Sequence, residues 1–151
     1  MIVKCCLALA CVGLVACDNT VSGAAPGAPT DSEQASVQQD LQGSWLREYA
    51  EGGVKARRLL VLSANGSFSE SVRVTDAAGA VTHHQHEGTW LYDGTNLKRK
   101  YTSMDGKPPS RLNLPFAAFE VKFALKNEFV GVDNVHRNEV RYRRVQPETL
   151  L

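Results

Sequence analysis

From Leu41 to the C-terminus, apolar and polar residues alternate with a period of two, and turn residues interrupt the alternation about every ten residues. This period places successive side chains on opposite faces of an extended strand, whereas a helical period is weak in this part of the chain. Pairs such as Gly52-Gly53 and Asn65-Gly66 accept the positive φ of tight hairpin turns. The pattern therefore predicts strands over residues 44–50, 56–63, 67–75, 80–92, 96–104, 118–126, 128–133 and 136–145.

About eight antiparallel strands joined by short turns can close into an up-and-down barrel, which leaves no exposed sheet edge. An open sandwich of two sheets is the alternative. The chain has 151 residues, which is enough for one domain with a single core. We therefore expect an all-β fold, with one barrel domain over residues 41–151.

Two segments of this domain, residues 43–46 and 88–91, share the pattern Gly-[Ser/Thr]-Trp-Leu. A glycine lets the chain bend sharply or approach another backbone, and the following tryptophan can fill an apolar interior. Together with Asn65-Gly66-Ser67-Phe68 and the closing segment NEVRYRRV (138–145), this pattern resembles the lipocalin-like small β-barrels. The resemblance implies that a basic residue on the last strand packs across Trp45. It implies a fold and not a function.

The N-terminus has the composition of an export signal, because Lys4 precedes an apolar run that is too short to span a bilayer. The run ends in Leu14-Val15-Ala16-Cys17, which resembles the lipobox of bacterial lipoproteins. That resemblance implies removal of residues 1–16 as a signal peptide and lipidation of Cys17. An ordinary signal peptide with a chance cysteine is the alternative. In enteric bacteria, Asp18 after the lipidated cysteine implies retention in the inner membrane, although other bacteria sort differently. We expect a lipid-anchored domain on the periplasmic face, in the inner membrane or, alternatively, the outer one.

All four cysteines lie at or before Cys17, so the mature domain has no disulfide, thiolate metal site or cysteine nucleophile. Residues 17–40 contain almost no large apolar side chain and are expected to form a disordered tether. Residues 18–40 carry four acids and no Lys or Arg, whereas residues 41–151 carry sixteen Lys and Arg against twelve acids, a net charge of +4. This surplus suits either an ordinary solvated surface or an acidic partner.

Strand parity sorts the side chains of the predicted barrel into an inner and an outer face. If Trp90 points inward, His84 and His86 share its face, but a bulge at Gly88 would reverse them. Buried charged groups need a partner, water or a ligand. Two interpretations stay open: the inner polar groups satisfy one another, for instance Glu70 with Arg99 and a histidine with a tyrosine, or they line a cavity for one small ligand. The polar residues predicted on the inner face are Glu70, His84, His86, Arg99, Tyr101 and Tyr142.

His84 and His86, two residues apart on a strand, point the same way and can contribute to a Zn²⁺ or Cu²⁺ site, with Glu70 or His136 as a third ligand. Two histidines alone do not define a metal site, so we assign neither a metal nor another cofactor. The zinc-protease pattern that begins at His86 fails, because Trp90 stands where its second histidine is required. The sequence also shows no convincing set of nucleophile, base and orienting group, so we expect no enzymatic activity.

Two further segments have alternative interpretations. Basic and aromatic residues interleave at residues 97–101 and 141–144, as they do in proteins that bind single-stranded nucleic acid. A periplasmic location argues against nucleic acid and favours a solvated barrel face. The proline-rich segment 104–116 is longer than a hairpin requires, and it is either a lid or contact surface or a plain connection.

These patterns favour a non-enzymatic, membrane-anchored lipoprotein that binds a small amphiphile in its interior or an envelope protein on its rim. The alternative is an inhibitor or immunity protein that neutralises an enzyme or toxin directed at the cell envelope. Known lysozyme-inhibitor lipoproteins usually carry cysteines that this domain lacks, which argues against that particular identity.

Overall fold

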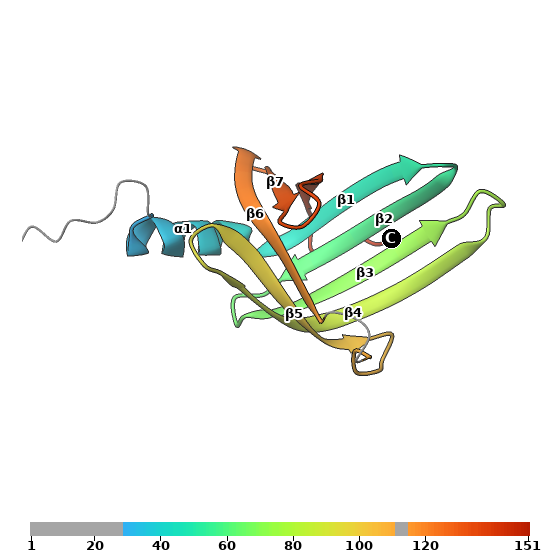
Figure 1. The fold of residues 1–151 in the computed structure, drawn as a ribbon, viewed down its shortest axis with the longest axis horizontal. Helices are drawn as coiled ribbons and strands as arrows, with labels where there is room; N and C mark the ends of the chain where they lie inside the picture. Colours follow the sequence, from blue (N-terminus) through green and yellow to red (C-terminus); the bar gives the residue numbers. More distant parts are fainter. Residues whose placement is uncertain (1–28, 111–114) are drawn as a thin grey trace, which may run out of the picture.

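The structure is a computed structural model that describes residues 29–110 and 115–151. In this part of the chain, one helix precedes eight strands that form a closed barrel in the order β1 to β8, each antiparallel to its neighbours (Figure 1). The prediction of an all-β, lipocalin-like antiparallel barrel is confirmed, and the sandwich alternative is wrong. Each predicted strand matches the observed one to within three residues at either end. The elements are α1 (Asp31–Leu41), β1 (Gly43–Glu51), β2 (Val54–Leu62), β3 (Ser67–Thr75), β4 (Val81–Tyr92), β5 (Asn96–Met104), β6 (Phe116–Leu125), β7 (Glu128–Asp133) and β8 (Glu139–Val145).

Helix α1 lies where disorder was expected for residues 31–40. Thr30 and Glu33 form a capping box that satisfies backbone N–H groups at the start of the helix. At the other end, Leu41 is fully buried, and its carbonyl accepts a 2.7 Å hydrogen bond from Trp45 Nε1. These contacts order a polar segment that would not fold alone. Residues 17–28 of the expected tether, the signal peptide and Cys17 lie outside the described residues. No helix in the described ranges is long and apolar enough to cross a membrane.

Strands β4 and β5 approach each other closely at Gly88, and the irregularity in their pairing lies on β5 and not on β4. A Cβ atom at Gly88 would lie 1.9 Å from the carbonyl oxygen of Lys100, so only glycine lets β5 approach this closely. The register between β4 and β5 shifts here, and the extra residue is Thr102 on β5. Because the bulge lies on β5, His84 and His86 stay on the same face as Trp90, as predicted.

The barrel is plugged at the end where α1 enters β1, which we call the closed end. The guanidinium of Arg144 lies 4.3 Å from the ring centre of Trp45 and donates hydrogen bonds to the carbonyls of Gln42 (2.7 Å) and Asp40. Trp45 is fully buried and packs edge-on against Phe129, with ring centres 4.7 Å apart. A basic residue of the last strand thus crosses Trp45, as the resemblance to lipocalin-like barrels implies.

At the opposite end, which we call the open end, the inner face becomes accessible to solvent. Along β1 the inner side chains change from the buried Trp45 through the half-buried Arg47 to Tyr49, which is 38% exposed. Along β4 the side chain of His86 is 14% exposed and that of His84 is 41% exposed. Strands β1 to β4 reach further toward this end than β6 and β7 do (Figure 1). Inner-face groups at the open end are therefore the ones that a ligand can reach.

Candidate functional site

A buried carboxylate on β3 organises the polar groups of the barrel interior. Glu70 is fully buried, and its Oε1 accepts a 2.7 Å hydrogen bond from Arg99 of β5. Its Oε2 accepts a 3.0 Å hydrogen bond from Arg58 of β2 and lies 3.2 Å from Nδ1 of His86 on β4. Four neighbouring strands therefore each contribute one side chain to what we call the Glu70 cluster.

Electrostatics keep the Glu70 carboxylate ionised. Burial raises the pKa of this carboxyl, but the hydrogen bond from His86 and the charges of Arg99 and Arg58 outweigh burial and hold the pKa well below its usual range. Burial lowers the pKa of the Arg99 guanidinium, and the charge of Glu70 more than compensates and raises it. The cluster is therefore charged at neutral pH, and Glu70 serves as a fixed anion that holds two guanidinium groups.

Aromatic rings surround the buried guanidinium of Arg99. Its central carbon lies 5.4 Å from the ring centre of Phe119 and 5.6 Å from those of Phe68 and Tyr101. Burial raises the pKa of Tyr101 to about 12 and also raises the pKa of Tyr142. In the described residues, three buried groups lack a protein hydrogen-bond partner, and all three can donate: Arg58 Nε, Arg99 Nε and Tyr142 Oη. Two of these groups belong to Arg58 and Arg99, so the Glu70 cluster has hydrogen-bond donors without an acceptor.

The structure brings together most of the inner-face residues predicted from the sequence. The expected pairing of Glu70 with Arg99 is present, and the ring of His86 packs edge-on against Tyr101 with centres 5.7 Å apart. His84 does not contact Glu70. Its Nδ1 instead lies 2.9 Å from a carboxylate oxygen of Asp105 at the open end. The interpretation in which the inner groups satisfy one another thus describes the pairing around Glu70, whereas His84 belongs to the accessible part of the inner face.

The two histidines do not converge on a common point. Their rings lie nearly parallel with centres 6.3 Å apart, and each contacts a different carboxylate. Across residues 29–110 and 115–151, no group of three or more His, Cys, Asp or Glu side chains is arranged to hold a metal ion.

Two arginines on the inner face, Arg47 and Arg58, were not assigned there from the sequence. They are direct partners in the register between β1 and β2. Parity counted from Trp45 predicts the inward direction of Arg47, and parity counted from the buried Leu60 predicts that of Arg58. The guanidinium of Arg47 lies 4.5 Å from the ring centre of Tyr49 and makes no ion pair within the described part of the chain.

The inner face beyond the closed end carries more positive than negative charge. Among the described residues, Arg47, Arg58 and Arg99 face one buried carboxylate, Glu70, and a second carboxylate, Asp105, contacts His84 at the open end, so three guanidinium groups stand against two carboxylates. Glu51 has the same parity but lies exposed at the last position of β1. This surplus of guanidinium groups gives the open end the chemistry to bind an anion.

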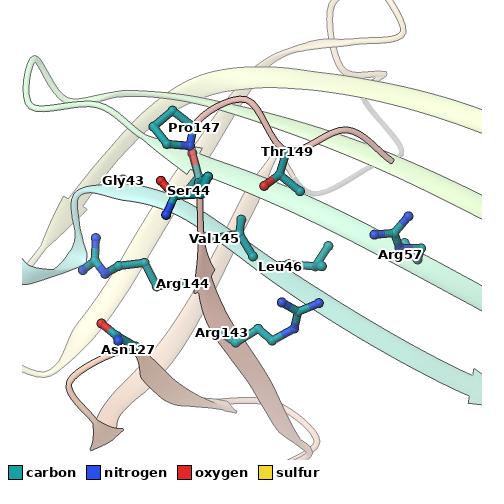
Figure 2. Close-up of a pocket in the computed structure, with 11 residues that line it drawn as sticks. Gly43, Ser44, Leu46, Arg57, Asn127, Arg143, Arg144, Val145, Pro147 and Thr149 are labelled. Atoms are coloured by element: carbon teal, nitrogen blue, oxygen red, sulfur yellow. The ribbon is translucent and has the colours of Figure 1, made fainter.

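A groove of about 660 Å³ lies on the outer wall between β1, β8 and the segment that follows β8 (Figure 2). The close-up shows Leu46 and Val145 in its middle, with Arg57 and Arg143 beside them. Both arginines contact one carboxylate, since Arg57 Nε is 2.9 Å and Arg143 Nη2 is 3.2 Å from the two oxygens of Glu48. The groove therefore joins an apolar floor to two guanidinium groups that retain free donors.

No protein-family model matches the chain, and no curated protein matches it significantly.

Proposed function

We propose that the chain is a lipid-anchored binding module of the bacterial cell envelope, which takes a small amphiphilic ligand at the open end of its barrel and catalyses no reaction. One observation carries the proposal: the two ends of the inner face differ. The closed end is filled by Trp45, Phe129 and Arg144, whereas the open end exposes cationic and aromatic side chains to solvent. A closed β-barrel offers a ligand a rigid wall, and its mouth is a common place for one to bind.

The anchor and the location rest on the N-terminal sequence. Leu14-Val15-Ala16-Cys17 supports lipidation of Cys17 after removal of residues 1–16, and Asp18 favours the inner membrane. The barrel domain would then lie at the periplasmic face of the membrane, where exported amphiphiles and lipid products are available to it. Replacing Cys17 with Ser should release the protein from the membrane fraction and remove the mass of the acyl chains.

A non-catalytic role agrees with the state of Glu70. A general acid or base must exchange its proton near the working pH. The carboxylate of Glu70 is instead held ionised by two guanidinium groups and is fully buried. Its role in the proposal is to position Arg58 and Arg99.

Native mass spectrometry tests the ligand directly. The full chain, extracted from membranes in a mild non-ionic detergent without heating or dialysis, should carry an additional mass that disappears on denaturation. A spectrum with only the lipidated chain, in several growth conditions, would contradict a bound amphiphile. The Cys17→Ser protein is the matched control, since it separates a bound ligand from the covalent lipid.

The groove in Figure 2 favours a second candidate, an inhibitor or immunity protein that neutralises an acidic envelope-directed enzyme. Its two arginines and the net positive domain suit an acidic partner. In this case a stoichiometric protein partner should co-purify with the full chain after cross-linking, and the purified pair should show inhibition of that enzyme. Arg143→Glu should abolish both, while Arg47→Ala should leave them unchanged. Persistence of the complex in Arg143→Glu would contradict the use of this groove.

A further inference from the structure

We infer that Arg47 and Arg58 together bind an anionic group, a carboxylate or a phosphate monoester, so that the amphiphile taken at the open end is an anionic one. This inference rests on the proposed function and specifies the chemical class of its ligand. Neither arginine belongs to the polar set that the sequence predicts for the interior.

The first argument is the position of the two side chains. Arg47 and Arg58 are direct cross-strand partners, and both point to the inner face. Side chains opposite each other in an antiparallel pair have Cβ atoms about 5 Å apart, and like charges in this arrangement repel. An anion between the two guanidinium groups converts that repulsion into two attractive contacts.

The second argument is that Glu70, the one buried inner-face carboxylate among the described residues, already has its partners. Both oxygens of Glu70 are engaged, one by Arg99 and the other by Arg58 and His86. Arg47 stacks on Tyr49 and makes no ion pair with any described residue. Arg47 is therefore the inner-face guanidinium that lacks a carboxylate partner among the described residues. It lies on the open-end side of the Glu70 cluster, beside Arg58.

Accessibility is the third argument. Arg47 is half-buried, and the side chain of Arg58 retains 24% of its exposure. Partial burial strengthens electrostatic contacts relative to open water. Arginine presents a planar set of N–H donors that matches a carboxylate or a phosphate in a bidentate manner. The pair can thus be reached from solvent and still bind an anion more strongly than a fully exposed pair.

The surroundings indicate an amphiphile and not a free anion. Tyr49 and Val54 share the inner-face parity of the two arginines and are 38% and 36% exposed, and Val74 beside them is only partly buried. These side chains offer apolar contact to a hydrocarbon chain whose charged group lies at the two arginines. The proposed ligand is therefore a short or medium alkyl chain with one anionic end.

The test compares ligands that differ only in the head group. The full chain is placed in lipid nanodiscs, with empty nanodiscs as the blank, and its melting temperature is followed against hexanoate, hexyl phosphate and hexanol. Acetate and inorganic phosphate serve as anions without a chain. One or both hexyl anions should bind at least about tenfold more tightly than hexanol and than the chainless anions, since hydrogen bonds to charged groups carry that much affinity.

Three variants locate the site. Arg47→Ala should weaken binding of the hexyl anion about tenfold or more and leave hexanol unchanged. Arg47→Lys should recover part of the affinity, because it restores the charge but not the planar donors. Arg57→Ala is the matched control, since Arg57 precedes Arg58 on β2 but lies on the outer wall beside Glu48, and it should bind like the unmodified chain.

The possible outcomes separate failure of the inference from failure of the proposed function. Equal affinity for hexanol and the hexyl anions would overturn the anionic head group and leave an amphiphile-binding barrel intact. Equal affinity for acetate or inorganic phosphate would overturn the amphiphile and indicate a site for free anions. Binding of none of these probes would overturn both. Loss of anion binding in Arg57→Ala, with Arg47→Ala unaffected, would move the site to the outer groove.

Discussion

Each end of the barrel has an arginine stacked on an aromatic ring of β1, and the two arginines differ in what their remaining donors contact. At the closed end, Arg144 lies 4.3 Å from the ring centre of Trp45 and also donates to the carbonyls of Gln42 and Asp40. At the open end, Arg47 lies 4.5 Å from the ring centre of Tyr49 and makes no ion pair with a described residue. The same stacking thus completes the structure at one end and leaves unused donors at the other.

The Glu70 cluster lies between the two ends of the barrel. Removing the negative charge of Glu70 should give the largest loss of stability. Glu70→Gln leaves the buried Arg99 and Arg58 without an anion. Breaking a buried ion pair at one partner costs about 3–5 kcal/mol, so the free energy of unfolding should fall by about that amount. Urea denaturation of the full chain followed by tryptophan fluorescence measures the loss. A cost below about 1 kcal/mol would show that the cluster does not hold the interior together.

Lowering the pH should produce the same loss of stability gradually. Because the pKa of Glu70 is lowered in the folded state, the unfolded chain takes up the proton first, and stability falls as the pH decreases. The contribution of Glu70 is complete above about pH 5 and is lost below it, toward the depressed folded pKa. The Glu70→Gln protein lacks this contribution, so its stability should change less than that of the unmodified chain between about pH 5 and pH 3.

At the closed end, Arg144→Ala should give the next largest loss. The substitution leaves the carbonyls of Gln42 and Asp40 without this donor and uncovers one face of Trp45. Hydrogen bonds to a charged group contribute about 1.5–3 kcal/mol, so we expect a loss of about 2–3 kcal/mol in the free energy of unfolding. Hydrogen exchange should also quicken in α1. An unchanged exchange rate there would contradict a role for Arg144 in joining α1 to the barrel.

The start of α1 tests the closed end with a smaller change. Thr30 Oγ1 accepts a 3.3 Å hydrogen bond from the backbone N–H of Glu33, and Thr30→Ala removes it. Loss of such a cap costs about 1 kcal/mol. Exchange protection should decrease along α1, while the strands of the barrel keep theirs. Equal loss of protection in the β3 strand would show that α1 and the barrel unfold as one unit.

The barrel and the direction of most inner side chains could be predicted because a strand repeats every two residues. Counting from one reliably buried residue assigns a whole strand, and the assignments of Glu70, His86 and Arg99 follow from this rule. The same rule, counted from Trp45 and Leu60, would also have directed Arg47 and Arg58 inward, but they were not assigned to the inner face, and their significance depends on the register between β1 and β2. Register and partner choice are set by long-range pairing, which composition does not reveal.

Helix α1 was missed for a different reason. Residues 31–40 are mostly polar, so their composition predicts disorder. Their order comes from a local cap and from contacts with residues distant in the sequence, such as the 3.2 Å hydrogen bond from Gln34 to the carbonyl of Tyr92. A capping box at Thr30 and Glu33 was the one signal in the sequence that could have found the helix.

The smallest effect on stability is expected at the open end, where Arg47→Ala is the matched counterpart of Arg144→Ala. It removes the stacking on Tyr49, which stabilises the fold, and the repulsion from Arg58, which destabilises it. These terms are of similar size and opposite sign, so the free energy of unfolding should change by less than about 0.5 kcal/mol, as for an ordinary surface site. Urea denaturation measures this alongside Arg144→Ala under the same conditions. A loss as large as that of Arg144→Ala would show that Arg47 is part of the folded core. A negligible loss together with weaker binding of an anionic amphiphile would show that its donors are reserved for a ligand.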